Sequence, residues 1–129
     1  MKMSTRGRYA LIIMINLAKN EEGYLSIKEI SEKENISIKY LEKIISLLSK
    51  AGLVCVGHGK NGGYKLVKKP NEYKIGEILR VTEGPMEPAP CINDSNCDKK
   101  DTCEVYSFWN GLYENINSYV DDKTLADFL

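Results

Sequence analysis

The chain has 129 residues, of which 43% are hydrophobic and 28% charged, and these values are typical of one soluble globular domain. Its formal net charge is zero, which by itself gives no reason to expect nucleic-acid binding. No apolar run approaches the roughly 18 residues that a membrane-spanning helix needs, and the start of the chain lacks a signal-peptide pattern, so we expect a cytoplasmic protein without membrane contact.

Two helices are predicted in the first third of the chain. The first covers residues 5–19, with Ser4 or Thr5 as its N-cap. Apolar residues occupy nearly every face of this helix, which predicts central burial. The second covers residues 27–33 and begins after Ser26, which has the sequence context of a capping box.

A third helix and a hairpin follow. The helix covers residues 38–50, is capped by Ser37, and has one apolar face, formed by Leu41, Ile44, Ile45 and Leu48. Residues 53–56 and 64–67 are two short runs rich in β-branched and aromatic residues on either side of a glycine-rich turn. This pattern predicts a β-hairpin.

The last third of the chain contains a loop between two helices. Residues 75–82 have the spacing of a short helix, and residues 83–102 combine three prolines with two cysteines and are followed directly by a third cysteine, which predicts a loop. Helical spacing then returns over about the last 26 residues, with a heptad-like stripe of apolar residues: Val105, Trp109, Leu112, Ile116 and Tyr119. One helix cannot bury such a stripe alone, so we expect it to form a dimer interface.

The zero net charge conceals a division along the chain. Residues 1–74 carry 14 Lys and Arg against 7 Asp and Glu, a net +7, whereas residues 75–129 carry 4 against 11, a net −7. A basic half is what phosphate binding requires, although chance segregation of solvated charges would give the same imbalance. We expect a DNA-binding region in residues 1–74 and a linker helix, cysteine loop and dimerisation helix in residues 75–129, together forming one compact unit.

Two short helices followed by a glycine-rich hairpin are typical of a winged helix-turn-helix. The expected fold is mainly α with a small β-hairpin wing (α+β) and a long C-terminal dimerisation helix. The third helix would enter the major groove with its N-terminal side chains at the base edges. The residues expected to contact DNA are Arg6, Arg8, Ser26, Lys28, Ser37, Lys39, Tyr40, Glu42, Lys43, His58, Lys60 and Asn61.

Each of these assignments has a simpler alternative. The glycines of the hairpin tip could serve only to satisfy turn dihedral angles, with His58 as a solvated loop residue. Arg6 and Arg8 could equally be solvated side chains. For the helix-helix-hairpin order as a whole, however, DNA binding is the better explanation.

Three cysteines have the spacing C-x5-C-x5-C. Cys91, Cys97 and Cys103 lie in the proline-rich segment, and thiolates in a reducing compartment favour an iron–sulfur cluster, zinc or copper(I). The spacing differs from the short C-x2-C pairs of most zinc sites. Three free thiols, or a thiol switch without metal, remain the alternative. Cys55 is interpreted as a small buried apolar residue.

No catalytic motif is found in the sequence. A thiol redox enzyme would need a C-x-x-C pair, and the hairpin glycines match neither the Walker nor the dinucleotide-binding pattern. We therefore expect a protein that is not an enzyme.

Taken together, these residues resemble the Rrf2 family of winged-helix regulators, which includes IscR-, NsrR- and CymR-like proteins. The resemblance covers segments 4–10, 36–42, 59–66 and 75–78 and the three-cysteine loop that leads into Phe108 and Trp109. It implies a homodimer joined by the long C-terminal helix and a double-stranded DNA operator bound by the third helix and the wing. In the cysteine-bearing, IscR-like members it also implies an iron–sulfur cluster that alters DNA affinity.

The resemblance leaves the fourth cluster ligand open. IscR-like members have a histidine three residues after the third cysteine, where this chain has Tyr106. Tyr106, Glu104, Asp101, a solvent molecule or a small thiol are the candidates, and Arg8 occupies the position where some relatives supply an acidic ligand. We expect a labile 2Fe–2S cluster rather than 4Fe–4S, absent from apo preparations and suited to redox sensing. The alternative is a CymR-like regulator controlled by a protein partner, with zinc or free thiols at the loop.

Overall fold

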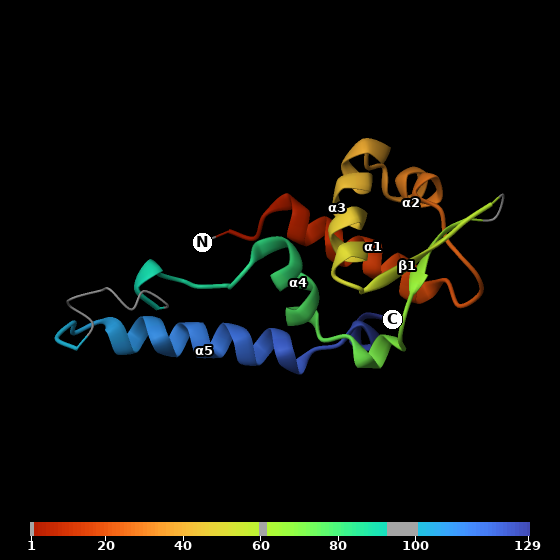
Figure 1. Ribbon diagram of the computed structural model, residues 1–129. Helices are drawn as coiled ribbons and strands as arrows, with labels where there is room; N and C mark the ends of the chain where they lie inside the picture. Colours follow the sequence, from red (N-terminus) through yellow and green to blue (C-terminus); the bar gives the residue numbers. More distant parts are fainter. Residues whose placement is uncertain (1, 60–61, 93–100) are drawn as a thin grey trace.

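The computed structural model describes residues 2–59, 62–92 and 101–129. In chain order the elements are α1 (Thr5–Lys19), α2 (Ile27–Glu34), α3 (Ile38–Lys50), β1 (Val54–Gly57), β2 (Gly63–Leu66), the short 3-10 helix η1 (Pro70–Glu72), α4 (Ile75–Glu83), the 3-10 helix η2 (Pro90–Ile92), α5 (Tyr106–Asp122) and the 3-10 helix η3 (Leu125–Phe128). Helices α1 to α4 and the hairpin form a body, and α5 runs along one side of it and beyond (Figure 1). The predicted mainly α fold with a two-stranded β wing is confirmed.

Helix α1 is the central element of the body. Ser4 caps it, because its hydroxyl accepts a hydrogen bond from the Gly7 amide at 3.2 Å. Ala10, Ile13 and Met14 are completely buried, and the helix packs against α3, α4, β2 and η3. The predicted central burial of this helix is confirmed, and the neighbouring elements take their positions from it.

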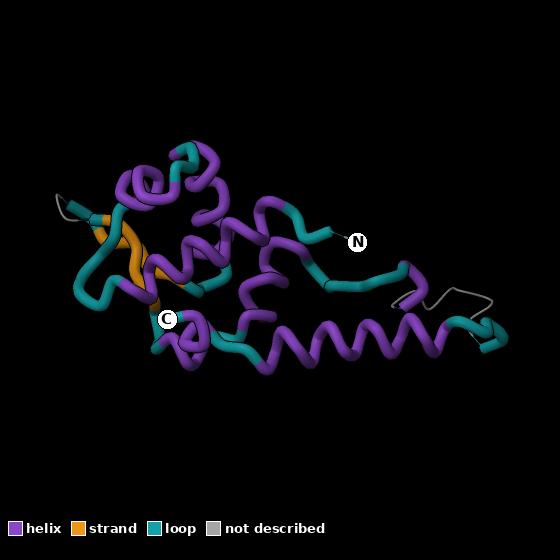
Figure 2. Tube along the Cα trace, turned by 180° about the vertical axis from the view of Figure 1, so that it is seen from behind, coloured by secondary structure: helices purple, strands orange, loops and turns teal. Residues whose placement is uncertain are grey.

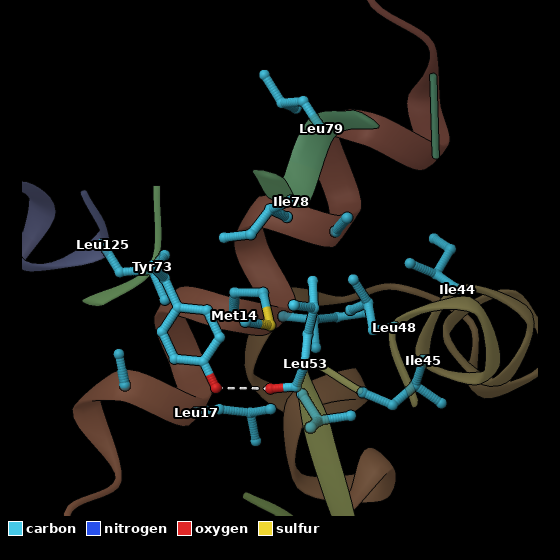
Figure 3. Close-up of a cluster of buried hydrophobic side chains, with 14 of the residues drawn as sticks. Met14, Leu17, Ile44, Ile45, Leu48, Leu53, Tyr73, Ile78, Leu79 and Leu125 are labelled. Carbon is cyan, nitrogen blue, oxygen red and sulfur yellow. Dashed lines mark hydrogen bonds between the residues drawn. The ribbon is translucent and has the colours of Figure 1, made fainter. Parts of the chain in front are cut away.

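Side chains from several elements meet in one core. Figure 3 shows Tyr73 beside this cluster, whose labelled members include Met14, Leu17, Leu48, Leu53, Ile78 and Leu125. Most of these side chains are less than 5% exposed. Because α4 and η3 contribute to the same core as α1 and α3, residues on both sides of position 74 form one packed unit.

The turn between α2 and α3 is closed by local hydrogen bonds. Asn35 ends α2 in the left-handed region, with φ of 56°, which asparagine tolerates better than most residues. The Ser31 hydroxyl donates to the Ile36 carbonyl at 2.5 Å, and the Ser37 hydroxyl accepts from the Tyr40 amide at 3.1 Å. These contacts hold the two helices in the tight arrangement that the sequence predicts.

The hairpin is antiparallel, with Val54 opposite Leu66 and Gly57 opposite Gly63. Its second strand also pairs with the segment before α2: the Leu25 amide donates to the Tyr64 carbonyl at 2.9 Å, and the Tyr64 amide to the Leu25 carbonyl at 2.8 Å. A Cβ on Gly63 would lie 2.5 Å from the Leu25 carbonyl oxygen, and its φ is +151°. Glycine at this position therefore permits the wing to attach to the body.

Helix α4 connects the body to α5. Arg80 donates to both carboxylate oxygens of Asp121 at 2.8 Å and to the side-chain oxygen of Asn117 at 2.6 Å. A Cβ on Gly76 would clash with the Asp121 carboxylate, so glycine there allows the two helices to approach. This contact sets the direction in which α5 leaves the body.

The C-terminal helix is shorter than its sequence pattern predicts. Helical spacing continues to the end of the chain, but α5 ends at Asp122. The Lys123 carbonyl instead accepts from the Ile75 amide at 2.9 Å, and Thr124 forms a β-bridge with Lys74. Pairing with the segment before α4 thus interrupts the helix, and η3 follows. In the described part of the chain, no helix has both the length and the apolar character needed to cross a membrane.

Candidate nucleic-acid interface and cysteine loop

Helix α3 has one buried face and one exposed face. Ser37, Lys39, Glu42 and Lys43 are exposed at its N-terminal end. Lys39 and Lys43 are four residues apart and therefore adjacent on the helix surface. The face that packs into the core is formed by Leu41, Ile44, Ile45 and Leu48. The arrangement leaves polar and cationic side chains accessible at the end of the helix that a winged helix-turn-helix presents to a groove.

Tyr40 differs from its neighbours on α3 because it is half-buried. Its ring centroid lies 5.4 Å from that of Tyr9, with an edge-to-face angle of 83°. Such a pair contributes about 0.5–1.5 kcal/mol beyond its buried area. Tyr40 therefore holds α3 on α1, a packing role that the sequence analysis did not assign to it.

The start of α2 carries Ser26 and Lys28. The Ser26 hydroxyl accepts a hydrogen bond from the Glu29 amide at 3.1 Å and caps the helix. Lys28 is exposed. Of these two predicted contact residues, Ser26 is half-buried and has a structural partner, whereas Lys28 is freely accessible to a phosphate.

The wing carries exposed cationic or titratable groups on β2 and directly after β1. His58 is exposed directly after β1, while Lys60 and Asn61 lie outside the described residues. Lys65, opposite Cys55 across the hairpin, is also exposed, and its ammonium lies 4.8 Å from the centroid of the Tyr24 ring. Lys65 is not among the residues predicted to contact DNA, although its place on the second predicted strand puts it on the wing.

Arg6 and Arg8 lie in the first turn of α1 and are exposed. The Arg8 guanidinium donates to the Thr5 hydroxyl at 3.1 Å. Both arginines are accessible to an anionic partner, and Arg8 is held close to its own helix.

Two of the three loop cysteines lie within the described residues. Cys91 is half-buried in η2, and Cys103 is exposed shortly before α5; both are free thiols. Cys97 lies outside the described residues. Within the described segments, no group of three His, Cys, Asp or Glu side chains is arranged to hold a metal ion.

The candidates for a fourth ligand lie close to Cys103 in the sequence. Asp101 and Glu104 are exposed, and Tyr106 is half-buried at the start of α5.

Cys55 is half-buried on β1, more accessible than predicted, because β1 is an outer strand and its neighbour Val56 is 45% exposed.

The wing and the cysteine-bearing segment lie far apart. Figures 1 and 2 show the hairpin at one end of the molecule, and η2 with the start of α5 at the opposite end. A change at Cys91 or Cys103 cannot reach the wing of the same chain by direct contact. Within one chain, an influence on it would pass through the helices between.

Helix α5 has an exposed apolar surface and no fully buried residue. Val105, Phe108 and Tyr119 are 54%, 63% and 67% exposed, while the remaining stripe residues Trp109, Leu112 and Ile116 are half-buried. Phe108, whose ring centroid lies 5.0 Å from that of Trp109, is absent from the predicted stripe. Its position four residues before Leu112 was a usable signal.

The contact between α4 and α5 changes the pKa of Asp121. Hydrogen bonding from Arg80 lowers the pKa of the Asp121 carboxyl, and the positive charges of Arg80 and Lys74 act in the same direction. Both partners of the pair are about one-third exposed, so water and salt screen it. The pair stabilises the helix junction modestly.

Comparison with known proteins extends these observations to a family. The family model described as Rrf2, iron-dependent transcriptional regulator, matches residues 3–129 of the chain. Among curated relatives, the chain is 33% identical to the HTH-type transcriptional regulator IscR of Aliivibrio salmonicida, over 100% of this chain and 77% of the relative. It is 40% identical to the HTH-type transcriptional regulator CymR of Bacillus subtilis, over 98% of this chain and 88% of the relative.

A solved structure agrees with the architecture. The structure of CymR, described as the global cysteine regulator of B. subtilis, superposes with a TM-score of 0.82 at 39% identity, covering 99% of this chain and 95% of that one. Coverage of this extent includes the hairpin and α5 as well as the helix-turn-helix.

Proposed function

The chain belongs to the Rrf2 family of transcriptional regulators, and from this premise we propose that it is a cytoplasmic, homodimeric repressor with an operator affinity adjusted by its loop cysteines. In each protomer α3 would enter the major groove while the wing lies beside it on the backbone. The cysteines would hold an iron–sulfur cluster.

The division of α3 into two faces is the observation that carries this proposal. Its apolar residues pack into the core, while Lys39 and Lys43 extend to solvent from the N-terminal end of the helix. The half of the chain that contains α3 and the wing has a net charge of +7. Cations on such a surface displace counterions from the phosphates of a duplex, which favours binding at low salt.

The donor set of the loop suits an iron–sulfur cluster. Thiolates are the usual ligands of such clusters; Cys91 and Cys103 are free and accessible, and Cys97 would supply the third. Tyr106, Glu104 or Asp101 would complete the set, or a solvent molecule or small thiol would. When bound, the cluster would supply a redox-active, labile group, and a weak fourth ligand would suit a sensor of iron–sulfur supply, oxygen or nitric oxide.

Substitution of each cysteine in turn tests the cluster. Protein purified anaerobically is expected to contain iron and sulfide, and Cys91→Ser, Cys97→Ser and Cys103→Ser are each expected to lower both. Cys55→Ser is the matched control, because Cys55 lies in the wing, away from the loop, and its loss should leave both contents unchanged. Duplex binding is then compared with and without the cluster at fixed salt.

A CymR-like mode of regulation is the second candidate, favoured by the higher identity to CymR than to IscR, 40% against 33%. In that case the purified protein lacks iron and sulfide, and the loop holds zinc or free thiols. A protein partner would then change operator affinity. Equal iron contents in the Cys55→Ser and loop variants would contradict the proposed cluster. They would not contradict the proposal that the protein binds DNA.

A further inference from the structure

Tyr73 connects the two ends of the wing through one hydroxyl. Its side chain is completely buried, and the hydroxyl donates to the Leu53 carbonyl, directly before β1, at 2.6 Å (Figure 3). The same oxygen accepts from the Val67 amide at 2.9 Å and the Lys68 amide at 3.3 Å, directly after β2. A phenol hydroxyl has one donor and two acceptor positions. All three hydrogen-bonding positions of the Tyr73 hydroxyl are therefore used, and all three bind the base of the hairpin.

A second contact supports this arrangement. The Lys68 ammonium lies 4.8 Å from the centroid of the Tyr73 ring and 3.3 Å from the Glu77 carboxylate on α4. Burial raises the pKa of the Tyr73 hydroxyl, so the hydroxyl stays protonated at neutral pH and keeps its donor. The end of β2 is thus fixed to both Tyr73 and α4.

The backbone of Tyr73 is bound to a different part of the chain. The Tyr73 carbonyl accepts a hydrogen bond from the Leu125 amide at 3.1 Å, and the next residue, Lys74, forms a β-bridge with Thr124. Leu125 is completely buried. One residue therefore binds the base of the wing with its side chain and the segment after α5 with its backbone.

We propose that Tyr73 is a positioning residue for DNA binding, whose hydroxyl sets the orientation of the wing relative to α3 while its backbone ties that orientation to the segment following α5. An isolated two-stranded hairpin is marginally stable in water, so its direction depends on how its base is held. This inference rests on the proposed contact between the wing and DNA. It also identifies a connection between the wing and the C-terminal helix.

The substitution Tyr73→Phe removes the hydroxyl and keeps the ring in the core. We expect the Val67 and Lys68 amides to exchange with deuterium about tenfold faster, because each loses its acceptor. The Leu125 amide should keep its protection, since its acceptor is the backbone carbonyl of residue 73. Affinity for a duplex at fixed salt should fall about fivefold, because the wing spends less time in the binding orientation.

Tyr64→Phe is the matched control. It removes the hydroxyl of a half-buried hairpin tyrosine whose side chain packs against the core. Among the described residues that hydroxyl has no hydrogen-bond partner, so the substitution should change neither exchange at Val67 nor duplex affinity. Equally accelerated exchange at Leu125 in Tyr73→Phe would mean general destabilisation and would overturn the proposal. Faster exchange at Val67 with unchanged duplex affinity would overturn the positioning role alone. An unsubstituted protein that binds no duplex would instead overturn the proposed function, and with it any role of Tyr73 in DNA binding.

Discussion

Lys39 and Lys43 allow the DNA contact to be tested at the scale of single residues. Both are exposed on adjacent turns of α3, and neither packs in the core, so replacement by alanine should leave the fold intact. We expect Lys39→Ala and Lys43→Ala to weaken duplex binding. The slope of log affinity against log salt should fall by about one for each phosphate that a protomer no longer touches. Fluorescence anisotropy over a series of salt concentrations measures both quantities.

Lys123→Ala is a suitable control for the lysine variants. This residue lies beyond α5, where its ammonium is 5.5 Å from the centroid of the Tyr119 ring, in the acidic half of the chain. Its substitution should leave both affinity and salt slope unchanged. If Lys39→Ala and Lys43→Ala also leave them unchanged, the assignment of α3 as the recognition helix is wrong.

At the scale of elements, the junction between α4 and α5 should make stability depend on pH. The pKa of Asp121 is lowered in the folded protein by its hydrogen bond from Arg80. The pair therefore contributes stability above the ordinary aspartate pKa of about 3.9, and this contribution is lost as pH falls through the lowered folded value. Because both side chains are about one-third exposed, we expect Asp121→Asn to lower the free energy of unfolding at pH 7 by about 1 kcal/mol or less.

Urea unfolding at several pH values checks this expectation. The difference between Asp121→Asn and the unsubstituted protein should be constant from pH 7 to about pH 5 and shrink below about pH 4. Asp122→Asn is the matched control, because the neighbouring carboxylate is exposed, and it should lie close to the unsubstituted protein throughout. A difference that grows as the pH is lowered would contradict the assigned direction.

At the scale of the whole molecule, the exposed surface of α5 should determine the oligomeric state. A heptad-like stripe on an extended helix is buried by pairing with a second helix, and large exposed apolar patches mark interaction sites. We expect Trp109→Glu or Leu112→Glu to convert a dimer into monomers, measured by multi-angle light scattering. Because two protomers bind two half-sites, operator affinity should fall when the dimer is converted into monomers.

Ser118→Glu adds the same charge to another face of α5, where the side chain is exposed, and should leave the dimer intact. A dimer that persists in both Trp109→Glu and Leu112→Glu would refute α5 as the interface. Phe108, at 63% exposure, is the next residue to substitute on that helix.

The arrangement of the whole molecule also constrains how a signal could be transmitted. The 3-10 helix η2 and the start of α5 lie at the opposite end of the molecule from the wing (Figure 2), so within one chain a change near them would act through the elements between. Helix α5 begins near the loop and ends beside the segment that binds Tyr73. Movement of α5 is therefore a physical route by which the loop could alter the affinity of the protein for DNA.

The local features of this protein follow from short stretches of its sequence. Serine caps, the spacing of apolar residues on α3 and the glycine-rich hairpin all act over a few residues, and the first three helices and the wing lie where these patterns predict. The spacing of the three cysteines and the apolar stripe of α5 can also be recognised in the sequence, because both are patterns of residues close together in the chain.

Contacts between distant residues, in contrast, are visible only in the folded chain. Tyr73 and Leu53 are 20 residues apart in the chain, and Arg80 and Asp121 are 41 apart, so no local periodicity connects them. Likewise α5 ends at Asp122, against its helical spacing, because Lys123 and Thr124 pair with the segment before α4. Long-range hydrogen bonds and burial override local preference wherever the chain folds back on itself, and here they fix the direction of α5 and the base of the wing.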